Sequence, residues 1–163
     1  MAAVVELLKS VRNIVPLTGE GVSAHFAAQG WMPEGRPKNG FETSWDKDGI
    51  GGWVHPHDGG VRVEFTVWMR NADDDGTGYF EDAEAVYEEG EQALSAFLPE
   101  ILSSSLADGL VEAEGTADDT DEFIAFRKWG LDGRTLIVAV IQEDTDLPVR
   151  LITALEDRPP GEG

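Results

Sequence analysis

Residues 123–155 read FIAFRKWGLDGRTLIVAVIQEDTDLPVRLITAL, and this stretch decides the fold. It holds three apolar runs that are separated by two turn signals. Asp132-Gly133 supplies the positive φ angles that a tight hairpin needs, and residues 143–148 form a longer connection. The middle run, 136–141, is apolar on both of its faces, which is typical of a central strand that is covered on each side. The sequence therefore predicts an antiparallel meander on which the rest of the chain packs.

The hydrophobic period predicts a second block of three strands upstream, at residues 41–45, 50–55 and 61–70. Turn signals rich in Asp and Gly separate these strands, DKDG after the first and HDGG after the second. In the third strand the odd positions from Val61 to Met69 are apolar, and the even positions are polar apart from Trp68. This alternation predicts one face in the core and one face in water.

Three segments have the spacing of amphipathic helices. Residues 4–15 place their apolar side chains on one face, and residues 18–29 predict a short helix with Gly30 as its C-terminal cap. The long segment 80–97 has an apolar inner face and an acidic outer face. Pro99 lacks an amide donor and clashes with the preceding turn, so we expect it to kink or restart this helix.

The remaining segments predict connections. Residues 31–40 are rich in Pro and Gly and residues 112–122 are acidic, so both are expected to be surface loops. The resulting order, α-α-βββ-α-βββ, predicts an α+β fold: an antiparallel sheet of about six strands, with the N-terminal helices and the long central helix packed on one face. We expect a single domain over residues 1–157 and a flexible tail over residues 158–163.

Length and composition narrow the class of protein. The 163 residues suit one globular domain, and the lack of cysteine excludes disulfides, thiolate metal ligands and thiol catalysis. No apolar run is long enough to span a bilayer, and the N-terminus lacks the basic region of a secretory signal. These features predict a cytoplasmic protein that does not bind membranes.

Charge is the strongest compositional signal. Asp and Glu number 32 against 12 Lys and Arg, which gives a formal net charge of −20. Such a charge repels nucleic acid and anionic membranes and attracts basic proteins. The alternative is that the acidity serves only solubility or salt adaptation, which predicts evenly scattered acids rather than one dense face.

One acidic loop partly matches a calcium-binding loop. Asn71, Asp73, Asp75 and Gly76 fall at positions one, three, five and six of the EF-hand pattern. The twelfth position is Asp82 instead of the longer Glu, and the preceding element is predicted to be a strand rather than a helix. A solvated loop between strand and helix is the favoured interpretation.

Motifs of catalysis are absent from the sequence. His55 and His57 form an H-x-H pair beside Asp58, but no fourth metal ligand is evident. The chain contains no G-x-S-x-G elbow, no P-loop and no G-x-G-x-x-G, and pairs of carboxylates are expected by chance among so many acids. The sequence therefore predicts a non-enzymatic protein without metal or cofactor.

The candidate partner-binding residues surround the junction between strand 61–70 and the long helix. Trp68 and Arg70 belong to residue types that are enriched at the centres of protein interfaces. For Trp68, packing beneath a helix or the tail is the favoured interpretation, and an exposed anchor is the alternative. The acidic side chains that follow would pair with a basic partner. The predicted contact residues are Trp68, Arg70, Asp73, Asp74, Asp75, Glu81, Glu84, Glu88, Glu89 and Glu91.

The strand pair WGLDGRTL at 129–136, closing into LPVRL at 147–151, resembles the immunity-type and uncharacterised proteins of actinobacteria. This resemblance implies a non-enzymatic protein that neutralises a basic toxin. The order of elements is also similar to the type III secretion chaperone and YbjN-like fold, which implies instead a dimeric chaperone that binds a client segment. The chain differs from that fold in its additional N-terminal helix and in lacking a clear helix after the last strand. We expect a monomer or a homodimer.

Overall fold

A computed structural model describes most of the chain, namely residues 2–14, 17–35, 37–38, 40–57, 60–70, 79–112, 123–131, 133–142 and 148–157. The helices are α1 (Ala2–Arg12), α2 (Gly19–Ala28), α3 (Tyr79–Leu102) and the 3₁₀ helix η1 (Ser105–Gly109). The strands are β1 (Met32–Pro33), β2 (Pro37–Lys38), β3 (Phe41–Glu42), β4 (Ser44–Lys47), β5 (Ile50–His57), β6 (Gly60–Arg70), β7 (Leu110–Glu112), β8 (Phe123–Leu131), β9 (Arg134–Ile141) and β10 (Val149–Asp157).

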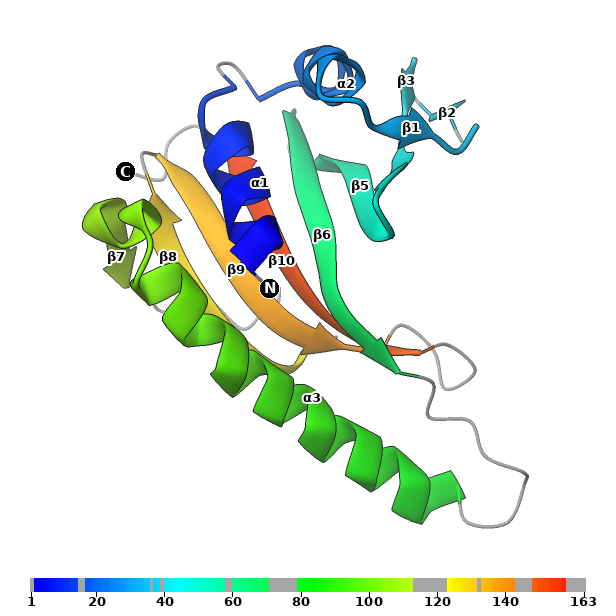
Figure 1. The fold of residues 1–163 in the computed structure, drawn as a ribbon, viewed down its shortest axis with the longest axis vertical. Helices are drawn as coiled ribbons and strands as arrows, with labels where there is room; N and C mark the ends of the chain where they lie inside the picture. Colours follow the sequence, from blue (N-terminus) through cyan, green and yellow to red (C-terminus); the bar gives the residue numbers. More distant parts are fainter. Residues whose placement is uncertain are drawn as a thin grey trace.

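Eight of these strands form one antiparallel sheet in the order β1-β4-β5-β6-β10-β9-β8-β7, and β2 pairs separately with β3. The predicted meander is confirmed as β8, β9 and β10. Strand β10 joins the two strand blocks because it pairs with β9 on one side and with β6 on the other (Figure 1). Every residue from Leu136 to Ile141 is buried, as expected for a strand that is covered on both faces.

The predicted number of about six strands was wrong, since the main sheet has eight. The expected loop at residues 31–40 contains β1 and β2, and the expected strand at 41–45 is divided into β3 and β4. Strand β7 is a further addition at the far edge. Strands of two to four residues are too short to show a period of two, so the pattern could not indicate them.

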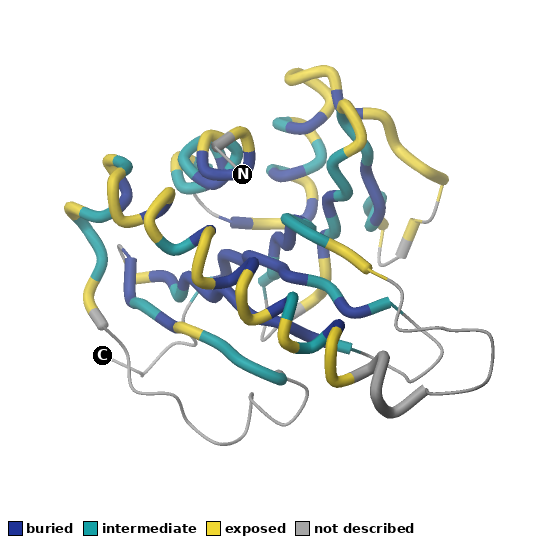
Figure 2. Tube along the Cα trace, turned by 60° about the horizontal axis from the view of Figure 1, so that its bottom comes forward, coloured by how far each residue is buried: buried dark blue, intermediate teal, exposed yellow. Residues whose placement is uncertain are grey.

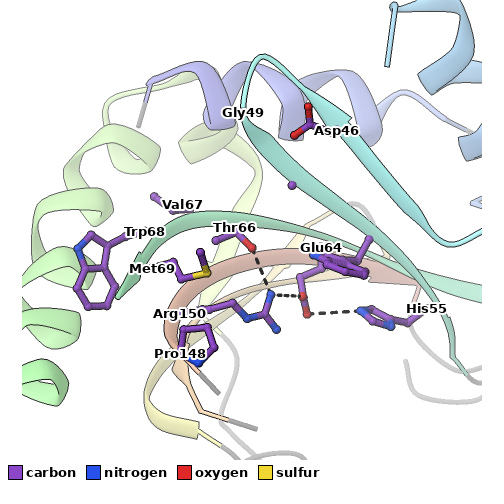
Figure 3. Close-up of a pocket in the computed structure, with 12 residues that line it drawn as sticks. Asp46, Gly49, His55, Glu64, Thr66, Val67, Trp68, Met69, Pro148 and Arg150 are labelled. Carbon is purple, nitrogen blue, oxygen red and sulfur yellow. Dashed lines mark hydrogen bonds and ion pairs between the residues drawn. The ribbon is translucent and has the colours of Figure 1, made fainter. Parts of the chain in front are cut away.

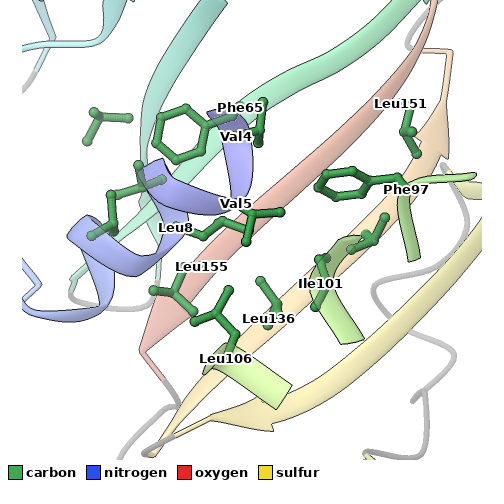
Figure 4. Close-up of a cluster of buried hydrophobic side chains, with 14 of the residues drawn as sticks. Val4, Val5, Leu8, Phe65, Phe97, Ile101, Leu106, Leu136, Leu151 and Leu155 are labelled. Carbon is green, nitrogen blue, oxygen red and sulfur yellow. The ribbon is translucent and has the colours of Figure 1, made fainter. Parts of the chain in front are cut away.

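The expected packing of the helices on one face is confirmed for α1, α2 and α3. Side chains of all three belong to the same buried cluster as Phe65 of β6 and Leu136 of β9. Phe97 and Ile101 of α3 lie over β9 and β10, on the same side of the sheet as Val5 and Leu8 of α1 (Figure 4). Figure 2 shows that burial is concentrated in the central strands, while much of α3 remains exposed on its outer side. None of the described helices is long and apolar enough to cross a bilayer.

The other face of the sheet carries a smaller buried cluster. Its members are Ile137, Ala139, Ile141, Ile152 and Ala154 from the two central strands, with Phe126 packed against them. The central strands therefore bury side chains on both faces, which explains their continuous apolar sequence.

Local signals in the sequence explain three boundaries of the elements. Asp48 and Gly49 have φ angles of 52° and 82°, the pair of positive values that joins β4 to β5 through a two-residue turn. Thr18 caps the N-terminus of α2 by accepting a hydrogen bond from the amide of Gly21. Gly30, at a φ of 87°, follows the same helix as predicted.

Of the two outcomes expected at Pro99, a restart of the helix was wrong, because α3 continues through the proline to Leu102. Pro99 removes one amide donor, which leaves the carbonyl of Ser95 without its helical partner. Both residues are exposed, so water can satisfy that carbonyl. The amide of Ser103 still donates to the carbonyl of Pro99 at 2.9 Å, and Ile101 is fully buried beyond the proline.

The end of α1 is held by a buried cation. The Arg134 guanidinium donates hydrogen bonds to the carbonyls of Val11, Arg12 and Ile14, and to the carboxylate of Asp157 at 2.8 Å. A positive charge is favourable where helix carbonyls lack partners. The first residue of β9 thus fixes α1 against the sheet.

Candidate functional site

The partner-binding residues predicted at the end of β6 are placed by a β-bulge. Thr66 lies opposite Ile152 of β10, but Trp68 lies opposite the adjacent Leu151, so that Val67 is an extra residue. A bulge of this kind shifts the alternation of side chains by one position. Trp68 therefore faces the helices, and Met69 faces the opposite side, where it is 59% exposed. The predictions of a polar-face Trp68 and a core Met69 were both wrong.

Trp68 is half-buried and packs with the main core. A Cβ atom on Gly90 of α3 would lie 3.4 Å from the Trp68 ring and 2.8 Å from Val140. Glycine at this position therefore lets α3 approach the sheet closely. Packing beneath a helix, the interpretation favoured for Trp68, is the arrangement observed. Trp68 also lines one end of the pocket described below.

The acidic residues of α3 that the structure describes line its outer side. Glu84, Glu88 and Glu91 are exposed, and we call these three the acidic row. Glu89 is partly exposed and forms an ion pair with Arg70 at the end of β6. Asp73, Asp74 and Asp75 lie outside the described residues, and so does the side chain of Glu81.

Helix α3 is unusual in having no positive charge of its own. Its 24 residues contain seven Asp and Glu and neither Lys nor Arg. Glu84 and Glu88 are four residues apart and Glu88 and Glu91 three, so like charges are neighbours on the helix surface. Each such pair costs a few tenths of a kcal/mol, about 0.2–0.5.

A pocket of about 610 Å³ opens on the opposite face of the sheet, over β4, β5, β6 and the start of β10 (Figure 3). We call it the β5–β6 pocket. Asp46 lies opposite Gly51 in the sheet and Trp53 lies opposite Glu64, so the period of two places all four positions on one face. Met69 joins this face because of the bulge.

The floor of the pocket is a buried ionic group. The Glu64 side chain is 7% exposed, and its Oε2 accepts a hydrogen bond of 3.2 Å from Nη1 of Arg150. The same nitrogen lies 3.2 Å from the Thr66 hydroxyl. His55 Nε2 lies 3.8 Å from Glu64 Oε1, which is an ion-pair distance and too long for a hydrogen bond. Figure 3 shows these groups converging from β5, β6 and β10.

The environment of Glu64 favours its ionised form. Burial alone raises the pKa of the Glu64 carboxyl, but the polar interaction with His55 and the positive charge of Arg150 outweigh burial. Together they hold the pKa of Glu64 below its usual value. The pocket therefore contains a carboxylate that stays charged although it is almost out of contact with water.

The rim of the pocket combines an aromatic ring with a second carboxylate. Trp53 is half-buried and stacks on His55, with ring centroids 6.5 Å apart and an angle of 12° between the planes. Asp46 is half-buried and has no ion-pair partner among the described residues. A Cβ atom on Gly51 would lie 3.7 Å from the Trp53 indole nitrogen, an ordinary contact distance, so the glycine leaves space in the pocket floor.

The structure gives no support, in the part of the chain that it describes, to the two candidate metal sites, the calcium-like loop and the His55–His57 pair. The calcium-like loop from Asn71 lies outside that part of the chain, as do the His57 side chain and Asp58. His55 instead lies beside Glu64. Among the residues that the structure describes, no cluster of three or more His, Asp or Glu could hold a metal ion.

Sequence reasoning missed the β5–β6 pocket because its parts lie far apart in the chain. Glu64 and Arg150 are 86 residues apart and meet only because β10 pairs with β6. The alternation in β6 placed Glu64 on the polar face of the strand. An acidic residue is expected there to be exposed, so the sequence did not indicate a buried carboxylate. A comparison with known families, characterised proteins and solved structures finds no match to this chain.

Proposed function

We propose that this chain is a non-enzymatic, cytoplasmic protein of the immunity type, which binds and neutralises a basic protein. The observation that carries the proposal is α3, with its seven carboxylates, its lack of Lys and Arg, and its exposed acidic row. Seven carboxylates on one helix without Lys or Arg form a dense acidic surface, which supports a binding face over the scattered acids expected of salt adaptation.

The charges of α3 have a physical cost that a basic partner would relieve. Repulsion between Glu84 and Glu88, and between Glu88 and Glu91, weakens the free helix slightly. Lys and Arg of a partner would convert this repulsion into attraction and would speed the encounter between the proteins. The ion pair between Arg70 and Glu89 adjoins the acidic row and supports the same surface as the contact region.

The test compares capture by the native protein and by the variant Glu84→Gln/Glu88→Gln/Glu91→Gln. Each immobilised protein is incubated at low salt with a lysate of the source organism, washed, and eluted with a salt step for mass spectrometry. We expect the native protein to release one basic protein in stoichiometric amount, and the variant to lose it. The captured protein, once purified, should associate more slowly as salt rises and should lose its activity when bound.

The matched control removes the same amount of charge elsewhere. Glu20, Glu34 and Asp108 are exposed and lie outside α3. The variant Glu20→Gln/Glu34→Gln/Asp108→Asn should keep the captured protein. Equal loss from both variants would mean that the charge acts generically and would refute a specific acidic surface.

The secretion-chaperone alternative makes a different prediction about assembly. It requires a stable homodimer in isolation and an extended client segment as the ligand. Sedimentation equilibrium of the purified protein distinguishes the two functions, since a neutralising protein can act as a monomer. A dimer that binds unfolded segments, without inhibiting a folded partner, would favour the chaperone.

A further inference from the structure

Two carboxylates in the β5–β6 pocket have hydrogen-bonding capacity to spare. Asp46 has no ion-pair partner among the described residues. Glu64 uses Oε2 to accept from Arg150, whereas its Oε1 has only the 3.8 Å contact with His55. A carboxylate oxygen can accept two hydrogen bonds, so both groups can receive donors from a ligand.

The same pocket provides surfaces that suit a flat cation on an apolar stem. The indole ring of Trp53 is the best aromatic partner for a cation, since its face carries negative electrostatic potential. Met69 and Pro148 add apolar walls that can cover the methylene groups of a long side chain. Gly51 leaves room beside the ring, as its Cβ position lies only at ordinary contact distance from Trp53.

The charge balance of the pocket decides the class of ligand. Arg150 is already engaged by Glu64 and Thr66 and is itself largely buried. Its positive charge offsets that of Glu64, so when His55 is unprotonated the Asp46 carboxylate leaves the site negative. In a chain of net charge −20 this arrangement disfavours anions and attracts cations.

We propose that the β5–β6 pocket binds an arginine side chain of the basic partner. Its guanidinium stacks on Trp53 and donates a hydrogen bond to Oε1 of Glu64, and the Asp46 carboxylate adds negative charge at the rim. A guanidinium suits the site better than an ammonium because it is planar and weakly hydrated and stacks on an aromatic ring. This inference rests on the proposed function, since it takes the partner to be basic, and it names the anchor by which the partner is held.

The test uses N-acetyl-arginine amide as the probe and NMR of the N–H groups of the whole protein as the readout, with binding followed at the indole N–H of Trp53. N-acetyl-citrulline amide, which has nearly the same shape but no charge, is the matched control ligand. We expect a saturable shift with the arginine probe and about tenfold weaker binding with citrulline. Equal binding of the two ligands, or shifts confined to α3, would overturn the proposal.

Two variants locate the binding in the pocket. Asp46→Asn should weaken binding of the arginine probe about tenfold, because it removes a negative charge from the rim of the pocket. Gly51→Val should abolish the saturable shift by filling the space beside Trp53, and valine suits a strand. If Gly51→Val does not fold, Asp46→Asn still decides the outcome. Unchanged binding in Asp46→Asn would refute the proposed geometry.

The pocket and the proposed function can fail separately. The Glu84→Gln/Glu88→Gln/Glu91→Gln variant should bind the arginine probe as the native protein does, since the acidic row lies on the other side of the sheet. If this variant loses the captured protein but still binds the arginine probe, the loss is due to the acidic row and not to the pocket. Normal capture by the Gly51→Val variant would show that the partner binds without using the pocket, and would refute the anchor.

Discussion

The two faces of one sheet, only a residue apart along β6, have different roles. Phe65 is fully buried and packs with the helices, whereas its neighbour Glu64 is almost as buried on the other face but is charged. The helix face is stabilised mainly by buried apolar area. The pocket face holds a carboxylate that must be compensated by Arg150 and His55. Burial alone therefore does not distinguish the two faces, and the buried, compensated charge beside an open pocket is what makes the pocket face the candidate site.

The largest effect is expected on the helix face, from Phe97→Ala. Phe97 is fully buried in the main core, so its removal leaves a cavity between α3 and the sheet. We expect the free energy of unfolding to fall by about 3–5 kcal/mol, measured by urea denaturation. Leu102→Ala is the matched control, since Leu102 of the same helix is 53% exposed and its truncation should change stability little. A similar loss in both variants would contradict the assignment of the faces.

On the pocket face, Glu64→Gln should cost less. It keeps the shape of the side chain but removes the charge that Arg150 requires, at an expected cost of about 2 kcal/mol. The free energy of unfolding of the native protein and the variant is compared at neutral pH. A stability equal to that of the native protein would show that the pair with Arg150 contributes nothing.

The difference in stability between the native protein and Glu64→Gln should depend on pH. Because the pKa of Glu64 is lowered in the folded state, its stabilisation is complete above the ordinary glutamic acid value of 4.5. It is lost as the pH falls through the lowered pKa, so the native protein and Glu64→Gln should converge in stability at acid pH. Urea unfolding of both proteins from neutral to acid pH measures this, and a difference that persists would mean that the charge is not responsible.

The features that the sequence predicted are those with a repeating local pattern. The apolar runs from 123 to 155 predicted the meander, and the spacing in α3 predicted its inner face. The bulge at Val67 has no such pattern, because it exists only as a mismatch between two strands that are distant in the chain. The bulge therefore places Trp68 and Met69 on the faces of the sheet opposite to those predicted. This changes the part of the candidate site that these two residues form.

The pocket itself could not be predicted for the same reason. The ion pair between Glu64 and Arg150 forms only because β6 pairs with β10. The open volume of the pocket depends on the absence of a side chain at Gly51 next to Trp53, which only the folded structure shows. The acidic row was predictable, since the positions of its residues follow from helical spacing alone. Local periodicity determines which face of a helix or strand a side chain lies on. The pairing of strands that are distant in the chain determines which other side chains it contacts.

A matched pair of glycine substitutions should give opposite signs on the two faces. Gly90→Ala places a Cβ atom 2.8 Å from Val140, a stiff side chain that cannot move aside easily. We expect a net loss of about 1 kcal/mol, since overpacking exceeds the gain in helix propensity. Gly51→Ala meets only ordinary contacts and should raise stability by about 0.5 kcal/mol. Thermal unfolding of both variants tests this, and losses of equal size would contradict the open pocket floor.

The smallest effect on stability is expected from the acidic row, and it should be a gain. Replacing Glu84, Glu88 and Glu91 by Gln relieves the like-charge neighbours on α3 and should stabilise the free protein by about 0.5 kcal/mol. The measurement is urea unfolding at low salt, where the difference is greatest, and it should vanish at high salt. The same variant is expected to lose its basic partner. Lower stability together with lost capture would point to a damaged helix, so only a stable variant that no longer binds supports the acidic row as a binding surface.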